Sequence, residues 1–125
     1  MKINRTVIVF DAADLYAVSS FWAGLYGGTV DADDEDGWHS VLVDGKPQIG
    51  VQHAPDHVSP KWPVGEQQVH LDLYIGTAAD LAPAHEEAVA LGARLIQQAE
   101  DLTTPDGFQV YADPAGHPFC LCWVS

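Results

Sequence analysis

Two cysteines near the C-terminus are the first residues whose chemistry could matter for function. Cys120 and Cys122 are separated by one residue in the apolar run FCLCWV, which follows a turn stretch, DPAG, at 113–116. Paired thiols can bind a soft metal or undergo redox chemistry, but this spacing matches no common zinc pattern. No basic neighbour or helix N-terminus is at hand to lower a thiol pKa, and buried cysteine commonly packs as a small apolar side chain. We therefore expect reduced thiols packed within the last strand.

His70 and Asp72 form the second candidate pair. Strand alternation in the run QQVHLDLYI puts both on one face, with the apolar residues on the other. Two positions along a strand span about 7 Å, so His70 is expected to lack a clear orienting partner. A general base, a ligand contact and a structural histidine remain open, and we favour the last two over catalysis. Serine chemistry has no motif here, and neither a phosphate-binding glycine loop nor a dinucleotide fingerprint is present.

The charge of the chain limits its partners. The 125 residues include 18 acidic and 5 basic ones, for a net charge of −13. Such a surface repels phosphate backbones, so we expect no nucleic-acid partner, whereas it attracts cationic ligands. Solubility alone also explains the acidity, and the run DADDED at 31–36 is typical of a solvated loop. Without a bilayer-length apolar stretch or a signal-peptide pattern, we expect a cytoplasmic protein with no membrane partner.

The elements that position these residues are repeated. The sequence AADL occurs at 12–15 and 78–81, each time after an alternating apolar run and before a helical pattern that ends at glycine. Asp14 and Asp80 are well placed as helix N-caps, and Gly27/Gly28 and Gly92 as C-terminal stops. GWHSVLVDGKP in the first half also parallels GFQVYADPAGHP in the second. The sequence therefore predicts two modules, each a strand, a helix and three strands, at about 1–53 and 66–125, joined by a proline-rich linker at about 54–65.

This tandem arrangement resembles the vicinal oxygen chelate superfamily, which includes glyoxalase I, bleomycin-resistance proteins and extradiol dioxygenases. FWAGLYGG is similar to the end of its first helix, VHLDL to its fifth strand, and DPAGHPFCL to the turn into its eighth strand. The resemblance covers essentially the whole chain and is closest to the short glyoxalase-like proteins. It implies an α+β fold in which two βαβββ modules form one open barrel-like mixed sheet with the helices outside. It specifies the fold better than the activity.

The resemblance also implies where a metal would be held. Metal-binding members take one ligand each from the first, fourth, fifth and eighth strands, and the matching positions here are Arg5, Gly50, His70 and Cys120. Of these only His70 is a usual ligand, since Arg5 is permanently cationic and Gly50 has no side chain. Cys120 suits only a softer metal than those of the enzymatic members. We therefore expect neither a metal in the cleft nor any other cofactor.

Without a metal, the cleft is expected to bind a small organic molecule. Its floor and walls are formed by polar and aromatic side chains: Arg5, Gln52, His70, Asp72, Cys120 and Cys122 on the floor, and Trp38, Trp62 and Tyr111 around it. Arg5 and Asp72 are expected to pair across the sheet, because a charge in a cleft needs a partner. Acidic charge and aromatic walls favour a cationic or flat ligand.

Three functions follow from this site. The first is binding or sequestration of a small molecule, as in the antibiotic-resistance type. The second is a metal-dependent lyase, isomerase or dioxygenase with an unusual ligand set, such as His70 with Asp72 or Cys120. The third is a metal-free enzyme or an interaction module with a vestigial cleft. The sequence leaves open whether the protein is an enzyme. The resemblance, together with the prevalence of symmetric dimers, predicts a homodimer.

Overall fold

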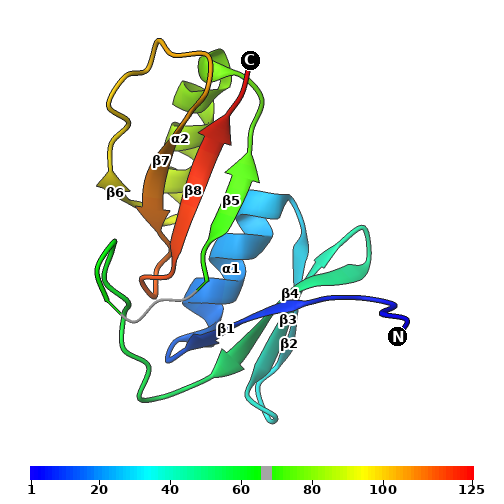
Figure 1. Cartoon of the computed structure of the whole chain (residues 1–125). Coiled ribbons are helices and arrows are strands. Elements are labelled where there is room, and N and C mark those ends of the chain that lie inside the picture. Colours follow the sequence, from blue (N-terminus) through cyan, green and yellow to red (C-terminus); the bar gives the residue numbers. More distant parts are fainter. Residues whose placement is uncertain (66–68) are drawn as a thin grey trace. The chain divides into compact units, whose positions relative to one another are not determined.

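Residues 1–65 and 69–125 are described by the computed structural model, and 66–68, the expected start of the second module, lie outside the described part. The chain divides into two compact units, Met1–Val58 and Ser59–Ser125. Each unit holds one strand–helix–strand–strand–strand module (Figure 1). The boundary between the units falls inside the proline-rich segment at 54–65.

The elements follow the same order in both units. The first unit contains β1 (Ile8–Ala12), α1 (Leu15–Tyr26), β2 (Thr29–Asp33), β3 (Trp38–Val43) and β4 (Lys46–His53). The second contains β5 (Leu71–Tyr74), a 3-10 turn (Ala78–Asp80), α2 (Leu81–Leu91), β6 (Arg94–Gln97), β7 (Gly107–Ala112) and β8 (Pro118–Trp123).

The strands of each unit form a mixed four-stranded sheet. Their orders are β1-β4-β3-β2 and β5-β8-β7-β6. In each sheet the first strand of the module runs parallel to the last, and the other neighbours are antiparallel. The α+β fold of two tandem βαβββ modules is therefore confirmed. Instead of one open barrel-like sheet there are two sheets not closed into a barrel, because every strand pairing among the described residues is made within one module.

The first AADL sequence starts α1 at its Asp14 cap as predicted, whereas Asp80 makes no side-chain cap to α2 and belongs to the capping box of the preceding 3-10 turn. Asp14 is the N-cap of α1, and its carboxylate accepts a hydrogen bond from the backbone of the first turn at 3.0 Å. In the second unit the Asp80 carboxylate accepts from the Thr77 backbone N–H at 2.8 Å, at the 3-10 turn that leads into α2. The helices end at Gly27 and Gly92, both with left-handed backbones (φ 68° and 119°). A capping interaction of this kind stabilises a helix by about 1 kcal/mol.

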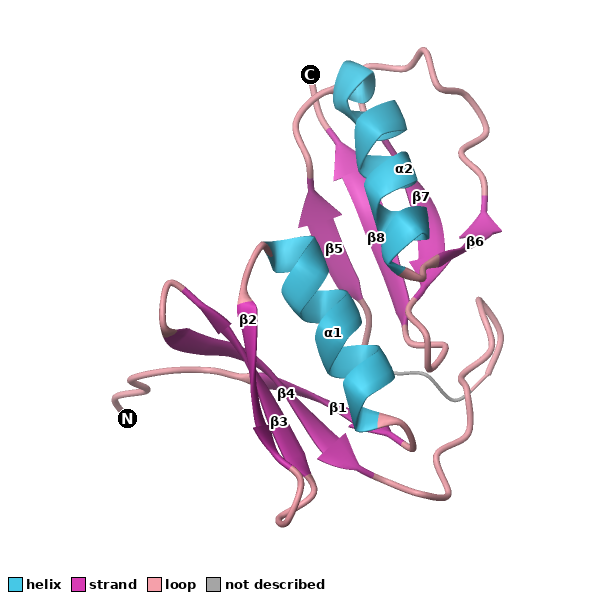
Figure 2. Ribbon diagram, turned by 180° about the vertical axis from the view of Figure 1, so that it is seen from behind, coloured by secondary structure: helices cyan, strands magenta, loops and turns pink. Residues whose placement is uncertain are grey.

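Each helix packs on one face of its own sheet (Figure 2). In the first unit α1 packs against β3 and β4, and the buried side chains include Val18, Phe21, Trp22, Val41, Ile49 and Val51. In the second unit α2 packs against β8, and the buried side chains include Leu81, Ala88, Tyr111, Phe119, Leu121 and Trp123. Within the described residues, neither helix has the length and apolar character that crossing a membrane requires.

Candidate functional site

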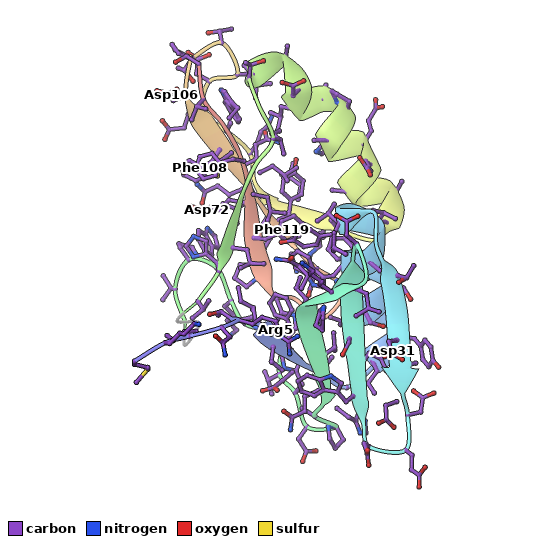
Figure 3. The ribbon with its side chains drawn as sticks, turned by 90° about the vertical axis from the view of Figure 1, so that its right-hand side faces the viewer. Arg5, Asp31, Asp72, Asp106, Phe108 and Phe119 are labelled. Atoms are coloured by element: carbon purple, nitrogen blue, oxygen red, sulfur yellow. The ribbon has the colours of Figure 1, made fainter. Side chains whose placement is uncertain are left out.

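Successive side chains of strand β8 lie on opposite faces of the second sheet. The rings of Tyr111 and Phe119 stack with their centroids 5.6 Å apart. Both lie on the side of the sheet that faces α2, as the hydrogen bond between Tyr111 and His85 of α2 shows. Cys120 and Cys122 therefore lie on the opposite face, as the alternation predicts. We call this the open face; its residues are Asp72, Tyr74, Phe108, Val110, Cys120 and Cys122. Figure 3 shows Asp72 and Phe108 on one side of the sheet and Phe119 on the other.

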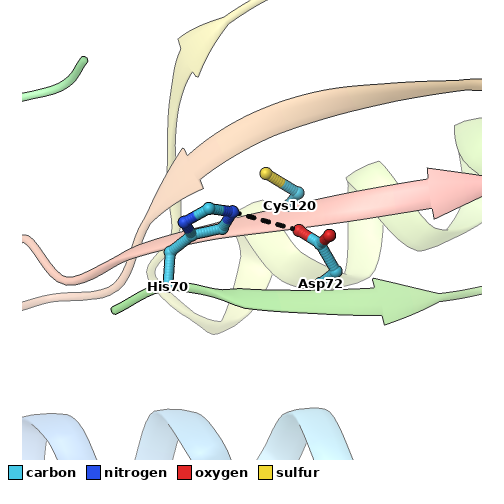
Figure 4. A group of neighbouring side chains, drawn as sticks. All are labelled: His70, Asp72 and Cys120. Carbon is cyan, nitrogen blue, oxygen red and sulfur yellow. Dashed lines mark ion pairs between the residues drawn. The ribbon is translucent and has the colours of Figure 1, made fainter. Parts of the chain in front are cut away.

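Three groups able to bind a ligand converge on the open face. Nε2 of His70 lies 3.3 Å from Oδ1 of Asp72, and one ligand atom each of His70, Asp72 and Cys120 lie within 4.8 Å of one another (Figure 4). Asp72 and Cys120 are register partners on the parallel strands β5 and β8. The His70 and Asp72 side chains are 40% and 47% exposed, so a solute can reach both.

The contact between His70 and Asp72 corrects the expectation that His70 lacks an orienting partner. His70 lies just before β5, which begins at Leu71, so its backbone is not paired in the sheet. The His70 ring turns toward the Asp72 side chain, so the distance between the two side chains is shorter than the spacing of their backbones along a strand. Asp72 therefore orients the imidazole.

Trp62 covers part of the open face. Its indole ring meets the His70 ring edge-to-face with centroids 5.2 Å apart, and its Nε1 donates to Oε1 of Gln97 at 3.1 Å. It also packs against the apolar cluster of Val110, Cys120 and Cys122, together with Ile96. The expected aromatic neighbour of His70 is thus present. The same ring explains why the two cysteines are buried although they lie on the face away from the helix.

The thiols are unreactive in this setting. Burial is the main cause that raises the pKa of Cys120 to about 12 and that of Cys122 to about 11, and the Asp72 carboxylate adds to both. Only the thiolate is a nucleophile, and at neutral pH both groups hold their protons. Both cysteines are free, as expected. The open face therefore presents Asp72 and His70 as its polar groups, with a protonated Cys120 thiol beside the Asp72 carboxylate.

The expected residues of the first unit are only partly brought together. Trp38 and Gln52 are register partners on β3 and β4. The Trp38 ring lies over Gly50, so a Cβ at position 50 would overlap the ring atom Cζ2 and lie 2.8 Å from Cη2. The space at this expected metal-ligand position is therefore filled by an indole. The Trp38 Nε1 donates to Oγ of Ser40 at 3.0 Å, which fixes the ring in place.

Arg5 lies outside the first strand, contrary to the expectation. β1 begins at Ile8, which is the register partner of Ile49, and Arg5 is exposed in the segment before it. Extending the parallel ladder toward Arg5 would place Pro47, which has no N–H to donate, opposite Thr6 and Lys46 opposite Arg5. Arg5 belongs to the first unit and Asp72 to the second, so the pairing of these two residues stays a prediction, as does a cleft shared by both modules.

The family's four-strand metal set does not fit this chain. Arg5 is a cation outside the strand, and Gly50 offers no donor beneath the Trp38 ring. His70 and Cys120 remain, and a third potential ligand, Asp72, lies beside them in the same unit. A metal held between the first, fourth, fifth and eighth strands is therefore not supported by these side chains.

Tyr111 is a core residue, not a pocket wall. It is fully buried on the helix side, where its hydroxyl oxygen lies 2.7 Å from Nδ1 of His85 and accepts a hydrogen bond from Nε2 of Gln109 at 2.9 Å. The reason is register: Tyr111 is the partner of Phe119, whose side chain points toward α2. The sequence alone did not specify this register.

A buried polar group in the first unit was not anticipated. His39 is fully buried on β3, with Nδ1 2.8 Å from Oγ of Ser19 on α1 and Nε2 2.7 Å from Oδ1 of Asp34. Tyr16 donates its hydroxyl to the other Asp34 oxygen at 2.7 Å, and these two hydrogen bonds, that from His39 first, lower the pKa of Asp34. The order Ser–His–Asp is that of a hydrolase triad, but Ser19 is fully buried, so no substrate reaches its hydroxyl.

The two modules place such polar contacts at matching positions. Ser19 and His85 occupy the same place after their AADL sequences, and His39 and Gln109 the same place after Gly37 and Gly107. In each unit a polar side chain of the helix is therefore linked to a buried polar side chain of the sheet, directly in the first and through Tyr111 in the second. The alternation in GWHSVLV, which puts His39 on the same face as Val41, is a signal that could have revealed the first of them.

Two βαβββ modules of this kind, each with its helix on one face of a mixed sheet, define a protein of the vicinal oxygen chelate class. Residues 7–122 match the family model described as glyoxalase-like domain. The chain therefore belongs to the glyoxalase-like family. No curated protein matches it.

Solved structures share the fold at low sequence identity. FosX, a fosfomycin resistance protein from Listeria monocytogenes, is 14% identical with a TM-score of 0.73, covering 100% of this chain and 96% of that one. A glyoxalase/bleomycin resistance protein/dioxygenase family enzyme from Burkholderia phytofirmans is 15% identical with a TM-score of 0.70, over 95% and 97% of the two chains. A glyoxalase-related enzyme from Fulvimarina pelagi is 17% identical with a TM-score of 0.70, over 97% and 88%.

Proposed function

We propose that this glyoxalase-like protein binds a small organic molecule at the open face of its second sheet, without a metal at the four family positions. The observation that carries the proposal is the exposed His70–Asp72 pair with the Trp62 ring against it. A carboxylate oriented by an imidazole fixes the polar part of a ligand, and an adjacent indole offers an apolar surface, which is the usual composition of a small-molecule site.

The chemistry of this site favours a cationic or flat aromatic ligand. Asp72 supplies a negative charge, and the net charge of −13 raises the local concentration of cations. An indole face adds about 0.5–2 kcal/mol for a well-placed cation. The two thiols are neutral at neutral pH, so the charge on this face is that of Asp72. A ligand with a carboxylate group is the alternative to a cationic ligand, because an unpaired Arg5 guanidinium would attract an anion.

The proposal is tested by a thermal-shift screen at low salt on metal-free protein. The compounds are planar cationic aromatics, bleomycin-like glycopeptides and small 2-oxo acids. We expect the cations to stabilise the protein, and Asp72→Asn to abolish the shift. Asp31→Asn is the matched control, because it removes the same charge from an exposed strand of the first unit (Figure 3). Stabilisation by the acids alone, lost in Arg5→Ala, would show that the ligand is an anion.

Metal-dependent catalysis of the lyase, isomerase or dioxygenase type is the second candidate. It is favoured by one observation, the convergence of His70, Asp72 and Cys120. Elemental analysis of native protein purified without an affinity tag separates it from the first candidate. A stoichiometric transition metal that is lost in His70→Ala would favour this second function.

We also propose a cytoplasmic homodimer with the ligand groove at its interface. The proposal is supported by β1 and β5, which are edge strands with one neighbour each among the described strands. They carry exposed apolar side chains at Ile8, Val9 and Tyr74, and open edges of this kind favour pairing with another chain. Light scattering at micromolar concentration tests it, and a monomer mass would contradict it.

A further inference from the structure

We propose that the second module holds, by itself, a binding site for a thiophilic divalent cation of the zinc class, with Nε2 of His70, Oδ1 of Asp72 and Sγ of Cys120 as ligands. Cys120 lies on β8, Asp72 on the adjacent β5 and His70 just before β5, and one ligand atom of each lies within 4.8 Å of the others (Figure 4). The site uses no residue of the first module. It keeps two of the four family positions, His70 and Cys120, adds Asp72 from the same module, and deepens the metal-dependent candidate above without requiring catalysis.

The distances suit a tetrahedral ion after a small adjustment. With zinc bonds of about 2.0–2.3 Å to nitrogen, oxygen and sulfur, neighbouring ligand atoms lie roughly 3.3–3.7 Å apart. The His70 and Asp72 atoms are already 3.3 Å apart. The other separations are at most 4.8 Å, so a shift of roughly 1 Å, within reach of side-chain rotation, completes the set. The paired strands hold the backbones of Asp72 and Cys120 opposite each other, which keeps that shift small.

The ligand types select the ion. One imidazole, one carboxylate and one thiol suit zinc and its relatives, whereas magnesium and calcium require oxygen ligands. A bound ion displaces the thiol proton, since a coordinating thiol is deprotonated outright. Three protein ligands leave a fourth position open for water or a ligand atom, as in zinc sites that carry chemistry.

The neighbouring residues orient the His70 ring toward Asp72 and leave both side chains accessible to an ion. Trp62 meets the His70 ring edge-to-face and so restricts its rotation. The ring edge that reaches Asp72 is the one bearing Nε2, the proposed ligand atom. The side chains of both residues are about half exposed, so an ion from solution reaches the site, while Cys120 closes it from below at 3% exposure.

The second cysteine provides the control. Cys122 lies two residues further along the same face, is also free and buried, and is not among the converging groups. Replacing either cysteine by serine removes one sulfur from the same apolar cluster, so the two variants perturb packing alike. Only Cys120→Ser removes a proposed ligand.

The test is a Co²⁺ titration of the metal-free, untagged chain, followed by absorption spectroscopy. We expect one equivalent to bind with a thiolate-to-cobalt charge-transfer band in the near ultraviolet, displaced by Zn²⁺ but not by Mg²⁺. Cys120→Ser loses the band and Cys122→Ser keeps it. His70→Ala and Asp72→Asn each weaken binding by about tenfold or more, since each removes one ligand. Circular dichroism confirms that each variant is folded.

Two results would overturn the proposal: no charge-transfer band in the folded wild-type chain, or its equal loss in Cys122→Ser and Cys120→Ser. The proposed organic-ligand function fails separately, since its thermal-shift screen uses metal-free protein. A cobalt band with no organic ligand found, or the reverse, therefore distinguishes the two proposals.

Discussion

Replacing Gly50 by alanine probes the contact that fills the expected metal position in the first unit. A Cβ at this position would overlap Cζ2 of the Trp38 ring and lie 2.8 Å from Cη2. Carbon atoms pack at about 3.5–4.0 Å, so the ring has to retreat by roughly 1 Å. That movement also strains the 3.0 Å hydrogen bond from the indole Nε1 to Ser40.

The magnitude follows from two opposing effects. Overpacking a filled site costs about 1–3 kcal/mol, whereas alanine in a strand interior is more stable than glycine by about 0.5–1 kcal/mol. Gly50→Ala is therefore expected to lower the free energy of unfolding by up to about 2.5 kcal/mol, with a central value of about 1 kcal/mol. In a Trp38→Ala background the clash is gone, and the same substitution is expected to raise it by about 0.5–1 kcal/mol. The effect of Gly50→Ala on the free energy of unfolding changes sign, because the Trp38 ring is the feature that disfavours alanine at this position.

A double-mutant cycle measures this reversal. Urea unfolding of the wild type, the two single variants and the double variant is followed by circular dichroism. Gly45→Ala is the control substitution, because it lies in the β3–β4 turn with nothing within 4 Å of its Cβ position. Its cost comes from the left-handed backbone (φ 76°) and is expected to be the same in both backgrounds. A coupling energy between Gly50 and Trp38 below about 0.5 kcal/mol would refute the reasoning.

Three further outcomes are expected. Ser19→Ala leaves Nδ1 of the buried His39 without its partner and lowers the free energy of unfolding by about 1–3 kcal/mol, measured by urea unfolding; an unchanged midpoint would contradict it. Gly116→Ala is destabilising by thermal melting, because its Cβ would overlap Oγ and Cβ of Ser59 and its φ is 93°; if Ser59→Gly, which removes both atoms, restored none of the loss, that overlap would not be its cause. The Cys120 thiol is expected to react with iodoacetamide negligibly at neutral pH and faster as the pH approaches 12. The unfolded thiol ionises near pH 9 while the folded thiol keeps its proton, so this group lowers stability as the pH rises above about 9; fast labelling of folded protein at neutral pH would exclude the raised pKa.

Features that depend on neighbours in sequence were predictable. The AADL repeat located both helices, since Asp14 and the terminal glycines act within one turn of the chain. Strand alternation placed Cys120 and Cys122 on one face, because the period of two is a property of the strand itself. The resemblance then supplied the family, which the match over residues 7–122 confirms.

Features that depend on pairing between distant segments were not predictable. The assignment of Tyr111 to the helix side follows from its register with Phe119, which no local pattern specifies. Arg5 falls outside β1, which begins at Ile8 opposite Ile49, and this limit appears only once β1 and β4 are paired. The contact between His70 and Asp72 depends on a ring orientation that spacing along the strand does not reveal.

The buried polar contacts at matching positions bear on how a chain with two related halves avoids assembling wrongly. The similarity of the modules invites exchange, with α1 docking on the second sheet or α2 on the first. Ser19 meets His39 in its own unit, whereas His85 meets Tyr111. An exchanged helix would bring Ser19 to the second sheet and His85 to His39, so neither of the two observed pairs would form. These contacts therefore favour the pairing of each helix with its own sheet over the exchanged arrangement.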